Sequence, residues 1–158
     1  MKNVRHSSLI SLCLIIALLL VILSGCSAET TKTALNAETV AEKLEQAGFQ
    51  ISDVTDSFGE GFSTALAAET DVLHVEFYEM DTVADAQGFQ QNVLSSLKSE
   101  SSASSYSNTE GENYLVSKLS AGGNYYVVTQ IENTVLIVAA DSGQKDAVKN
   151  FAESLGYI

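Results

Sequence analysis

The chain has 158 residues, of which 20 are Asp or Glu and 8 are Lys or Arg, so its net charge is −12. A chain this acidic lacks the basic patch that nucleic acids and anionic lipid surfaces require, which argues against both as partners. One of its two cysteines and one of its two histidines lie within the first 13 residues. The remainder holds too few of either to form an internal disulfide framework or a Cys/His zinc cluster.

The first 25 residues follow the three-part plan of a secretory signal. Lys2 and Arg5 precede an apolar run, Leu9–Leu23, and the small residues Ser24 and Gly25 then lead to Cys26. As a helix the run would span about 22 Å, short of the roughly 30 Å hydrocarbon core of a bilayer. A permanent transmembrane anchor is therefore the less favoured alternative.

The tetrapeptide Leu23-Ser24-Gly25-Cys26 resembles the lipobox of bacterial lipoproteins. The resemblance implies diacylglyceryl transfer to the Cys26 sulfur, cleavage between Gly25 and Cys26, and acylation of the new amino terminus. Two or more acyl chains anchor a protein stably. The expected plan is a removed leader at 1–25, a lipidated tether at 26–35 and one domain at 36–158. The resemblance places the protein on the outer face of the cell membrane, or at the outer membrane if the host has two.

Loss of Lys2 and Arg5 with the leader would leave six lysines against 20 acids, a net charge of −14 over 133 residues. In the first half of this mature chain, Asn36 is the expected N-cap of a helix that stops at Gly48. Alternating residues predict strands at 49–55, 62–68 and 73–78. A second helix is expected from Asp81 or Thr82 to Leu97, with Gln90 as the one polar residue in its apolar stripe.

In the second half, residues 99–111 hold six serines and no large aliphatic residue, which predicts an exposed loop. Strands are predicted at 113–119, 125–131 and 134–140, the last two joined by the turn Glu132-Asn133 with Asn133 tolerating a positive φ. The unbroken apolar run at 135–140 predicts a central strand, covered at least in part on both faces. A last helix is expected after Asp141 or Ser142, ending at Gly156.

This order, αβββαβββα, predicts an α+β fold: one antiparallel sheet of five to six strands with three helices on one face. The repeated spacing suggests an internal duplication, as does the echo of residues 44–49 in 152–157, although helix-glycine-aromatic junctions are common. Residues 48–55 and 131–134 resemble stretches of small surface lipoproteins of Gram-positive bacteria to which no function is assigned. That resemblance implies no activity.

His74, Glu76 and Tyr78 are expected on one face of one strand, about 6.6 Å apart at successive positions. They form either an acid–base pair, the start of a metal site that no second histidine completes, or a polar solvent-facing strand surface. A hollow containing His74 and two further polar groups would favour an enzyme. Burial of His74 among aliphatic residues would exclude one.

Two further groups of residues have alternative interpretations. Asp53, Asp56 and Glu60 form an acidic loop that suits Ca²⁺ in residue type, but their spacing does not match an EF-hand. Four tyrosines in the second half form either an exposed surface for a glycan or peptide or a set divided between core and surface. They are Tyr106, Tyr114, Tyr125 and Tyr126.

The sequence contains no nucleophile elbow and no phosphate-binding loop, so no catalytic residue, metal or cofactor is predicted. The favoured function is therefore a non-enzymatic, lipid-tethered module that binds a protein, peptide or wall partner outside the membrane. The alternative is an envelope hydrolase or metal-assisted enzyme that uses His74 and Glu76. A structural envelope component without a small ligand is the third hypothesis.

Overall fold

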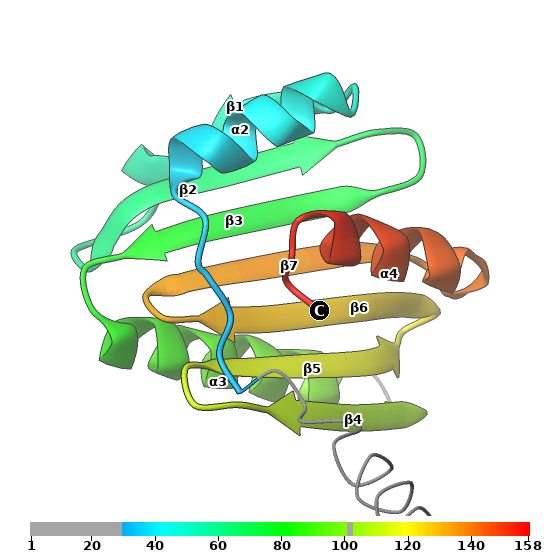
Figure 1. The fold of residues 1–158 in the computed structure, drawn as a ribbon. Coiled ribbons are helices and arrows are strands. Elements are labelled where there is room, and N and C mark those ends of the chain that lie inside the picture. Colours follow the sequence, from blue (N-terminus) through cyan, green and yellow to red (C-terminus); the bar gives the residue numbers. More distant parts are fainter. Residues whose placement is uncertain (1–29, 101–102) are drawn as a thin grey trace, which may run out of the picture. The chain divides into compact units, whose positions relative to one another are not determined.

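Within the described residues, 30–100 and 103–158, the computed structural model contains seven strands. These are β1 (Gln50–Asp53), β2 (Phe62–Glu69), β3 (His74–Met80), β4 (Ser105–Glu110), β5 (Tyr114–Ala121), β6 (Asn124–Ile131) and β7 (Thr134–Asp141). All pairings are antiparallel, and the strands form one sheet in the order β1-β2-β3-β7-β6-β5-β4 (Figure 1). The predicted α+β class with an antiparallel sheet is confirmed, and this part of the chain contains the three predicted α-helices.

Helices cover both faces of the sheet and make three layers (Figure 1). The helices α2 (Ala37–Gln46) and α4 (Lys145–Ser154) pack on one face, where Val40 and Val148 join a buried cluster with Leu136. The helix α3 (Val83–Glu100) packs on the opposite face, where Ala86 and Leu94 join a second buried cluster.

The prediction of three helices on one face is therefore wrong. The apolar stripe of a helix shows that it packs on a sheet, but not which face it packs on. The sheet itself explains the result, because the side chains of β7 alternate between the two clusters and are buried from Val135 to Ala140. Such a strand needs cover on both sides.

The internal duplication is not supported for the same reason. Two meanders, β1-β2-β3 and β5-β6-β7, meet at the antiparallel pair of β3 and β7, and each is followed by a helix. Two copies of one unit paired in this way would carry their helices on the same face. Here α3 and α4 lie on opposite faces.

The sheet also has one strand more than the sequence predicts, and the order of elements is αβββαββββα. The additional strand is β4, at the edge of the sheet, within the segment predicted to be a loop. All six of its side chains are exposed, and among the described strands it pairs only with β5. This strand is held by main-chain hydrogen bonds and buries no side chain. Its sequence therefore has no alternation of apolar and polar residues from which a strand could be predicted.

Several local predictions are confirmed. The strand β7 is the fourth of seven and so lies at the centre of the sheet. Asn36 caps α2, because its Oδ1 accepts the Thr39 N–H at 2.8 Å. Gly48 and Gly156 follow the ends of helices with φ values of +82° and +79°. At the β6–β7 turn the positive φ belongs to Glu132, at 50°, and not to Asn133 as expected.

Asn133 has another role at this turn: its Nδ2 donates to the Met80 carbonyl at 2.7 Å, and its own carbonyl accepts the Met80 N–H at 2.9 Å. These bonds tie the turn to the end of β3.

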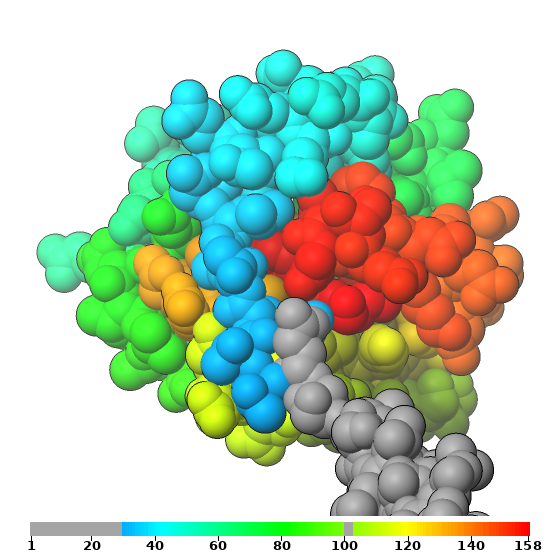
Figure 2. All heavy atoms as spheres, in the orientation of Figure 1, coloured from blue at the N-terminus to red at the C-terminus, as the bar shows by residue number. Residues whose placement is uncertain are grey.

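Residues 31–36, which we call the strap, approach α2 along the face that carries α2 and α4 (Figure 2). Ala34 and Leu35 pack against the buried cluster on that face. The leader 1–25, with Gly25, and the lipidation position Cys26 lie outside the described residues. Among the described residues, no helix combines the length and the apolar character that a membrane crossing needs.

Candidate functional site

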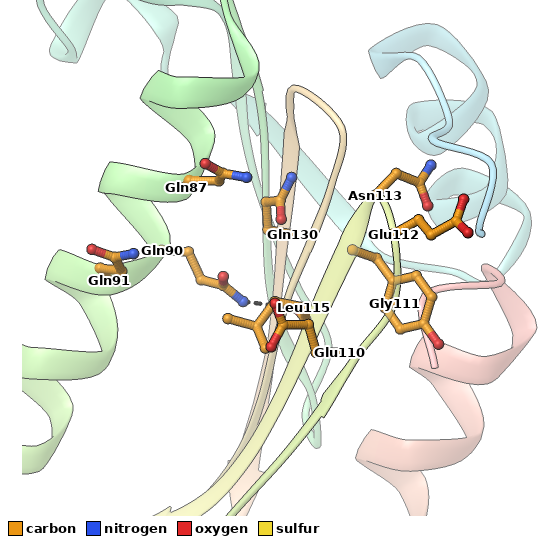
Figure 3. A pocket seen from close by; sticks show the side chains of 10 residues that line it. Gln87, Gln90, Gln91, Glu110, Gly111, Glu112, Asn113, Leu115 and Gln130 are labelled. Carbon is orange, nitrogen blue, oxygen red and sulfur yellow. Dashed lines mark hydrogen bonds between the residues drawn. The ribbon is translucent and has the colours of Figure 1, made fainter. Parts of the chain in front are cut away.

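A polar pocket of about 260 Å³ opens between α3 and the strands beneath it. Its walls are Gln87, Gln90 and Gln91 from α3, Gln130 from β6, and residues 110–115 around the β4–β5 turn. Figure 3 shows the amides of Gln87 and Gln90 extending from the helix towards the strands that carry Gln130 and Leu115. We call this hollow the amide pocket.

Strand pairing explains why these side chains meet. Gln130 of β6 lies opposite Leu115 of β5, which lies opposite Glu110 of β4. Directly paired residues in antiparallel strands project from the same face of the sheet. The three side chains therefore form a row on the face that α3 covers.

Gln90 holds α3 to the sheet at this place. It is only 1 % exposed, and its Nε2 donates to the Leu115 carbonyl at 2.8 Å and to the Val128 carbonyl at 3.1 Å. Because those carbonyls belong to two neighbouring strands, one side chain ties α3 to both β5 and β6.

The sequence contained one sign of this pocket, the lone polar Gln90 inside the apolar stripe of α3. Gln87, Gln91 and Gln130 carried no comparable signal. Gln87 and Gln91 are exposed residues of α3, where glutamine is common. Gln130 lies in β6, and only the pairing of that strand with β5 shows which face of the sheet its side chain is on.

Asn113, at the rim of the amide pocket, also forms two hydrogen bonds with the strap. Its Oδ1 accepts the Lys32 N–H at 2.9 Å, and its Nδ2 donates to the Lys32 carbonyl at 2.7 Å. The same Nδ2 lies 3.2 Å from the Glu132 Oε1. A second attachment follows at Ala37, whose N–H donates to the Glu79 Oε2 at 3.1 Å.

Replacing Asn113 with alanine should release the strap. Loss of both hydrogen bonds to Lys32 is expected to cost about 1–2 kcal/mol of stability. Trypsin should then cut after Lys32 several times faster, which mass spectrometry of timed digests of the full chain would measure. Asn108→Ala is the matched control, because Asn108 bonds Ser117 at the sheet edge and not the strap. Equal cleavage rates in wild type and Asn113→Ala would show that these bonds do not hold the strap.

The predicted cluster on β3 is brought together. His74 Nε2 and Glu76 Oε1 are 2.9 Å apart, and the Tyr78 hydroxyl donates to Glu76 Oε2 at 2.8 Å. Both carboxylate oxygens of Glu76 therefore have partners. The His74 side chain is 49 % exposed and that of Glu76 is 32 % exposed, so the pair lies at the surface.

These contacts shift three pKa values. The hydrogen bond to Glu76 raises the pKa of His74, and the same bond lowers the pKa of Glu76. Burial raises the pKa of Tyr78, and the neighbouring Glu76 charge adds to that effect. The hydroxyl of Tyr78 thus remains protonated and continues to donate to Glu76.

The stability that the His74–Glu76 pair adds should depend on pH. A raised His74 pKa in the folded state adds stability below about pH 6.5, which is lost as pH rises through the folded pKa. A lowered Glu76 pKa adds stability above about pH 4.5, which is lost as pH falls. His74→Asn should therefore cost under about 1 kcal/mol near pH 5.5, since the pair is exposed, and still less at pH 8.5.

Urea unfolding at the two pH values measures this difference. Tyr78→Phe is the control, because it removes a hydroxyl that stays protonated throughout this range. An equal loss of stability in His74→Asn at both pH values would show that the pair does not contribute as an ion pair.

His74 lies between two open hollows on the face of the sheet that carries α3. One, of about 270 Å³, includes Gln50, Ser52 and Glu69, and the other, of about 410 Å³, includes Asp141 and Tyr126. His74 is therefore not buried among aliphatic residues, and the hydrolase hypothesis is not excluded on that ground.

The sheet does not bring the Ser52 hydroxyl to this pair. Ser52 pairs with Ala67, and Ala67 pairs with Glu76. Two strand spacings of about 4.8 Å each therefore separate Ser52 from Glu76, roughly 10 Å in all. A Ser-His-Glu triad needs contacts near 3 Å.

The acidic loop has a local role. Asp53 Oδ1 accepts the Thr55 N–H at 2.9 Å and the Thr55 hydroxyl at 2.6 Å. The bond to the Thr55 hydroxyl, and then that to its N–H, lowers the Asp53 pKa. Within the described chain, no three His, Cys, Asp or Glu residues are placed to hold a metal ion, so Asp53, Asp56 and Glu60 do not converge.

The four tyrosines are divided between core and surface. Tyr114 and Tyr125 are buried in the cluster beneath α2 and α4, whereas Tyr106 is 43 % exposed. Tyr126 is half-buried on the other face. They form no common surface, so the glycan- or peptide-binding interpretation of this set is not supported.

No protein-family model matches the chain, and no curated protein matches it. Among solved structures, the chain is similar to a GTP binding regulator from Thermotoga maritima, with 16 % sequence identity and a TM-score of 0.50. The match covers 80 % of this chain and 93 % of that protein. At this identity the likeness concerns the fold alone.

Proposed function

We propose that this chain is a lipid-anchored extracytoplasmic protein whose folded part is a non-enzymatic binding module at the outer face of the cell membrane. The anchoring part of the proposal is supported by the lipobox-like residues 23–26 and by the leader that precedes them. In a host with two membranes, the outer membrane is the alternative location.

The amide pocket is the observation that carries the binding part of the proposal. Polar side chains converge there from a helix, a strand and a turn, and the described lining residues include no histidine, cysteine, serine or lysine. Amides and carboxylates in a preformed hollow bind and orient a polar ligand.

The attachment of the strap to Asn113 supports tethering close to the membrane. Six residue steps separate Cys26 from Lys32, so even an extended chain between them reaches only about 20 Å. A protein held in this way meets ligands at the cell surface rather than in the medium.

Replacing Cys26 with serine tests the anchor. Without the thiol no diacylglyceryl group can be transferred, so Cys26→Ser should keep residues 1–25 and take up no labelled fatty acid. The experiment compares the variant with wild type in the native host by membrane fractionation and mass spectrometry. Ser27→Ala is the matched control and should be lipidated like wild type. Normal processing of Cys26→Ser, or an unmodified Cys26 in wild type, would overturn the anchor.

A second candidate function is hydrolysis at the envelope, which the 2.9 Å contact between His74 and Glu76 beside open hollows favours. Hydrolysis of a panel of p-nitrophenyl esters tests it. Under the binding-module proposal, wild type and His74→Asn should both match the buffer rate. Turnover by wild type that His74→Asn abolishes would replace the binding module with an enzyme.

A further inference from the structure

The amide pocket has a definite hydrogen-bonding polarity, which follows from how its buried amides are held. Gln90 turns its Nε2 towards two main-chain carbonyls, those of Leu115 and Val128. Since a carbonyl can only accept, the amide of Gln90 cannot be reversed without placing oxygen against oxygen. Its Oε1 therefore faces away from the strands, and none of the described residues donates to it.

Gln130 has the same arrangement. It is 3 % exposed, and its Nε2 donates to the Glu132 carbonyl. That contact again fixes the orientation of the amide and leaves Oε1 as the free end, without a donor among the described residues. Two amide groups, each more than nine-tenths buried, thus line the pocket with unused acceptors.

The two carboxylates of the pocket lining belong to exposed side chains, and they too act as acceptors. Glu110 stands in the row with Leu115 and Gln130, and Glu112 lies in the turn that closes the pocket. Carboxylates accept hydrogen bonds and carry negative charge. A ligand that complements these acceptors supplies N–H donors and a positive charge.

We propose that the amide pocket binds a primary ammonium group. Its three N–H donors match the Oε1 atoms of Gln90 and Gln130 and the carboxylate of Glu110 at the end of β4. A volume of about 260 Å³ suits an amine on a short alkyl chain. The ammonium group comes from a small polyamine or from a lysine side chain of a peptide. This assignment rests on the proposed binding function and names the ligand class for it.

Isothermal titration of the full chain, produced in its bacterial host and purified in a nonionic detergent, tests the proposal. The probes are 1,5-diaminopentane and its neutral counterpart 1,5-pentanediol. Saturable binding of the diamine is expected, with no binding of the diol. Spermidine and Nα-acetyl-lysine methylamide then distinguish a free polyamine from a lysine side chain, since the pocket will favour one of them.

Two pairs of variants locate the binding. Glu110→Gln removes an acceptor charge and should weaken diamine binding about two- to fivefold, because the carboxylate is exposed. Glu153→Gln makes the same charge change on α4, on the opposite face, and should have no effect. Gln87→Lys supplies a competing ammonium at the pocket and should abolish binding, whereas Gln144→Lys should not. All four positions are exposed, so folding should persist, which circular dichroism verifies.

Three results would overturn the assignment: equal binding of diol and diamine, no saturable binding of either, or equal weakening by Glu110→Gln and Glu153→Gln. The last would mean that the diamine responds only to the overall negative charge. None of these results bears on the anchor at Cys26, which is measured independently, so failure of the ligand class and failure of the proposed function are distinguishable.

Discussion

Replacing Tyr157 with alanine is expected to lower the free energy of unfolding by about 3–5 kcal/mol, the range for large aromatic side chains in a core. Tyr157 is fully buried next to the last residue of the chain. Its ring meets that of Phe77 edge-on, with centroids 6.4 Å apart at 85°. Truncation would leave a cavity where α4, β3 and the strap meet.

The hydroxyl of Tyr157 contributes separately. It lies 2.8 Å from Thr134 Oγ1, and the Leu35 main chain also bonds to it. Because Thr134 gives its own proton to the Ile131 carbonyl at 2.9 Å, Tyr157 is the donor to Thr134. Tyr157→Phe should therefore cost only about 1–2 kcal/mol.

Urea unfolding followed by circular dichroism compares the two variants of Tyr157. A loss below about 2 kcal/mol in Tyr157→Ala would mean that the surrounding residues close the cavity, and that this ring is not a principal contact of the layer.

Replacing Phe89 with alanine is the second large expected effect, about 2–4 kcal/mol, below the value for a fully buried ring because Phe89 is half-buried. Phe89 is the contribution of α3 to an aromatic cluster with Phe58, Phe62 and Tyr78. Its ring centroid lies 4.6 Å from that of Tyr78 and 5.3 Å from that of Phe62. Loss of this ring should loosen α3 from the sheet.

Two controls separate packing from other effects. Phe89→Leu keeps most of the volume and should cost under about 1.5 kcal/mol. Val83→Ala, at an exposed position of the same helix, should change stability by no more than about 0.5 kcal/mol. Hydrogen exchange in α3 should accelerate in Phe89→Ala alone. Unchanged exchange there would show that Gln90 and Leu94 suffice to hold the helix.

Phe89→Ala should also weaken the amide pocket, since α3 carries three of its glutamines. The effect on diamine binding would be indirect, because Phe89 does not line the pocket. Diamine binding that survives a loosened α3 would indicate that Glu110, Glu112 and Gln130 alone bind the ammonium group.

Local features of this protein followed from the sequence because they depend on neighbouring residues. Asn36 caps the helix that begins one residue later, and Gly48 and Gly156 adopt the left-handed conformation that ends a helix. The apolar run from Val135 to Ala140 predicted the central strand, since only a strand covered on both faces buries every side chain.

Features that depend on distant pairing were decided by the tertiary structure. β4 is a strand only because β5 offers it an edge, and its six exposed side chains leave no apolar pattern. The face on which α3 packs could not be predicted from its own apolar stripe, because the strands present apolar side chains on both faces of the sheet. The left-handed position at Glu132 accompanies main-chain and side-chain bonds between Asn133 and Met80, 53 residues apart in the sequence.

The two candidate sites show the same division. His74, Glu76 and Tyr78 could be grouped from the sequence because a strand places every second residue on one face. The amide pocket could not, because Gln90 of α3, Gln130 of β6 and Glu110 of β4 meet only through the register of three strands and the packing of α3 on them. The sequence by itself determined the helices, the strands with an apolar pattern and the caps at Asn36, Gly48 and Gly156, whereas long-range pairing and packing decided the edge strand β4 and which polar side chains face one another.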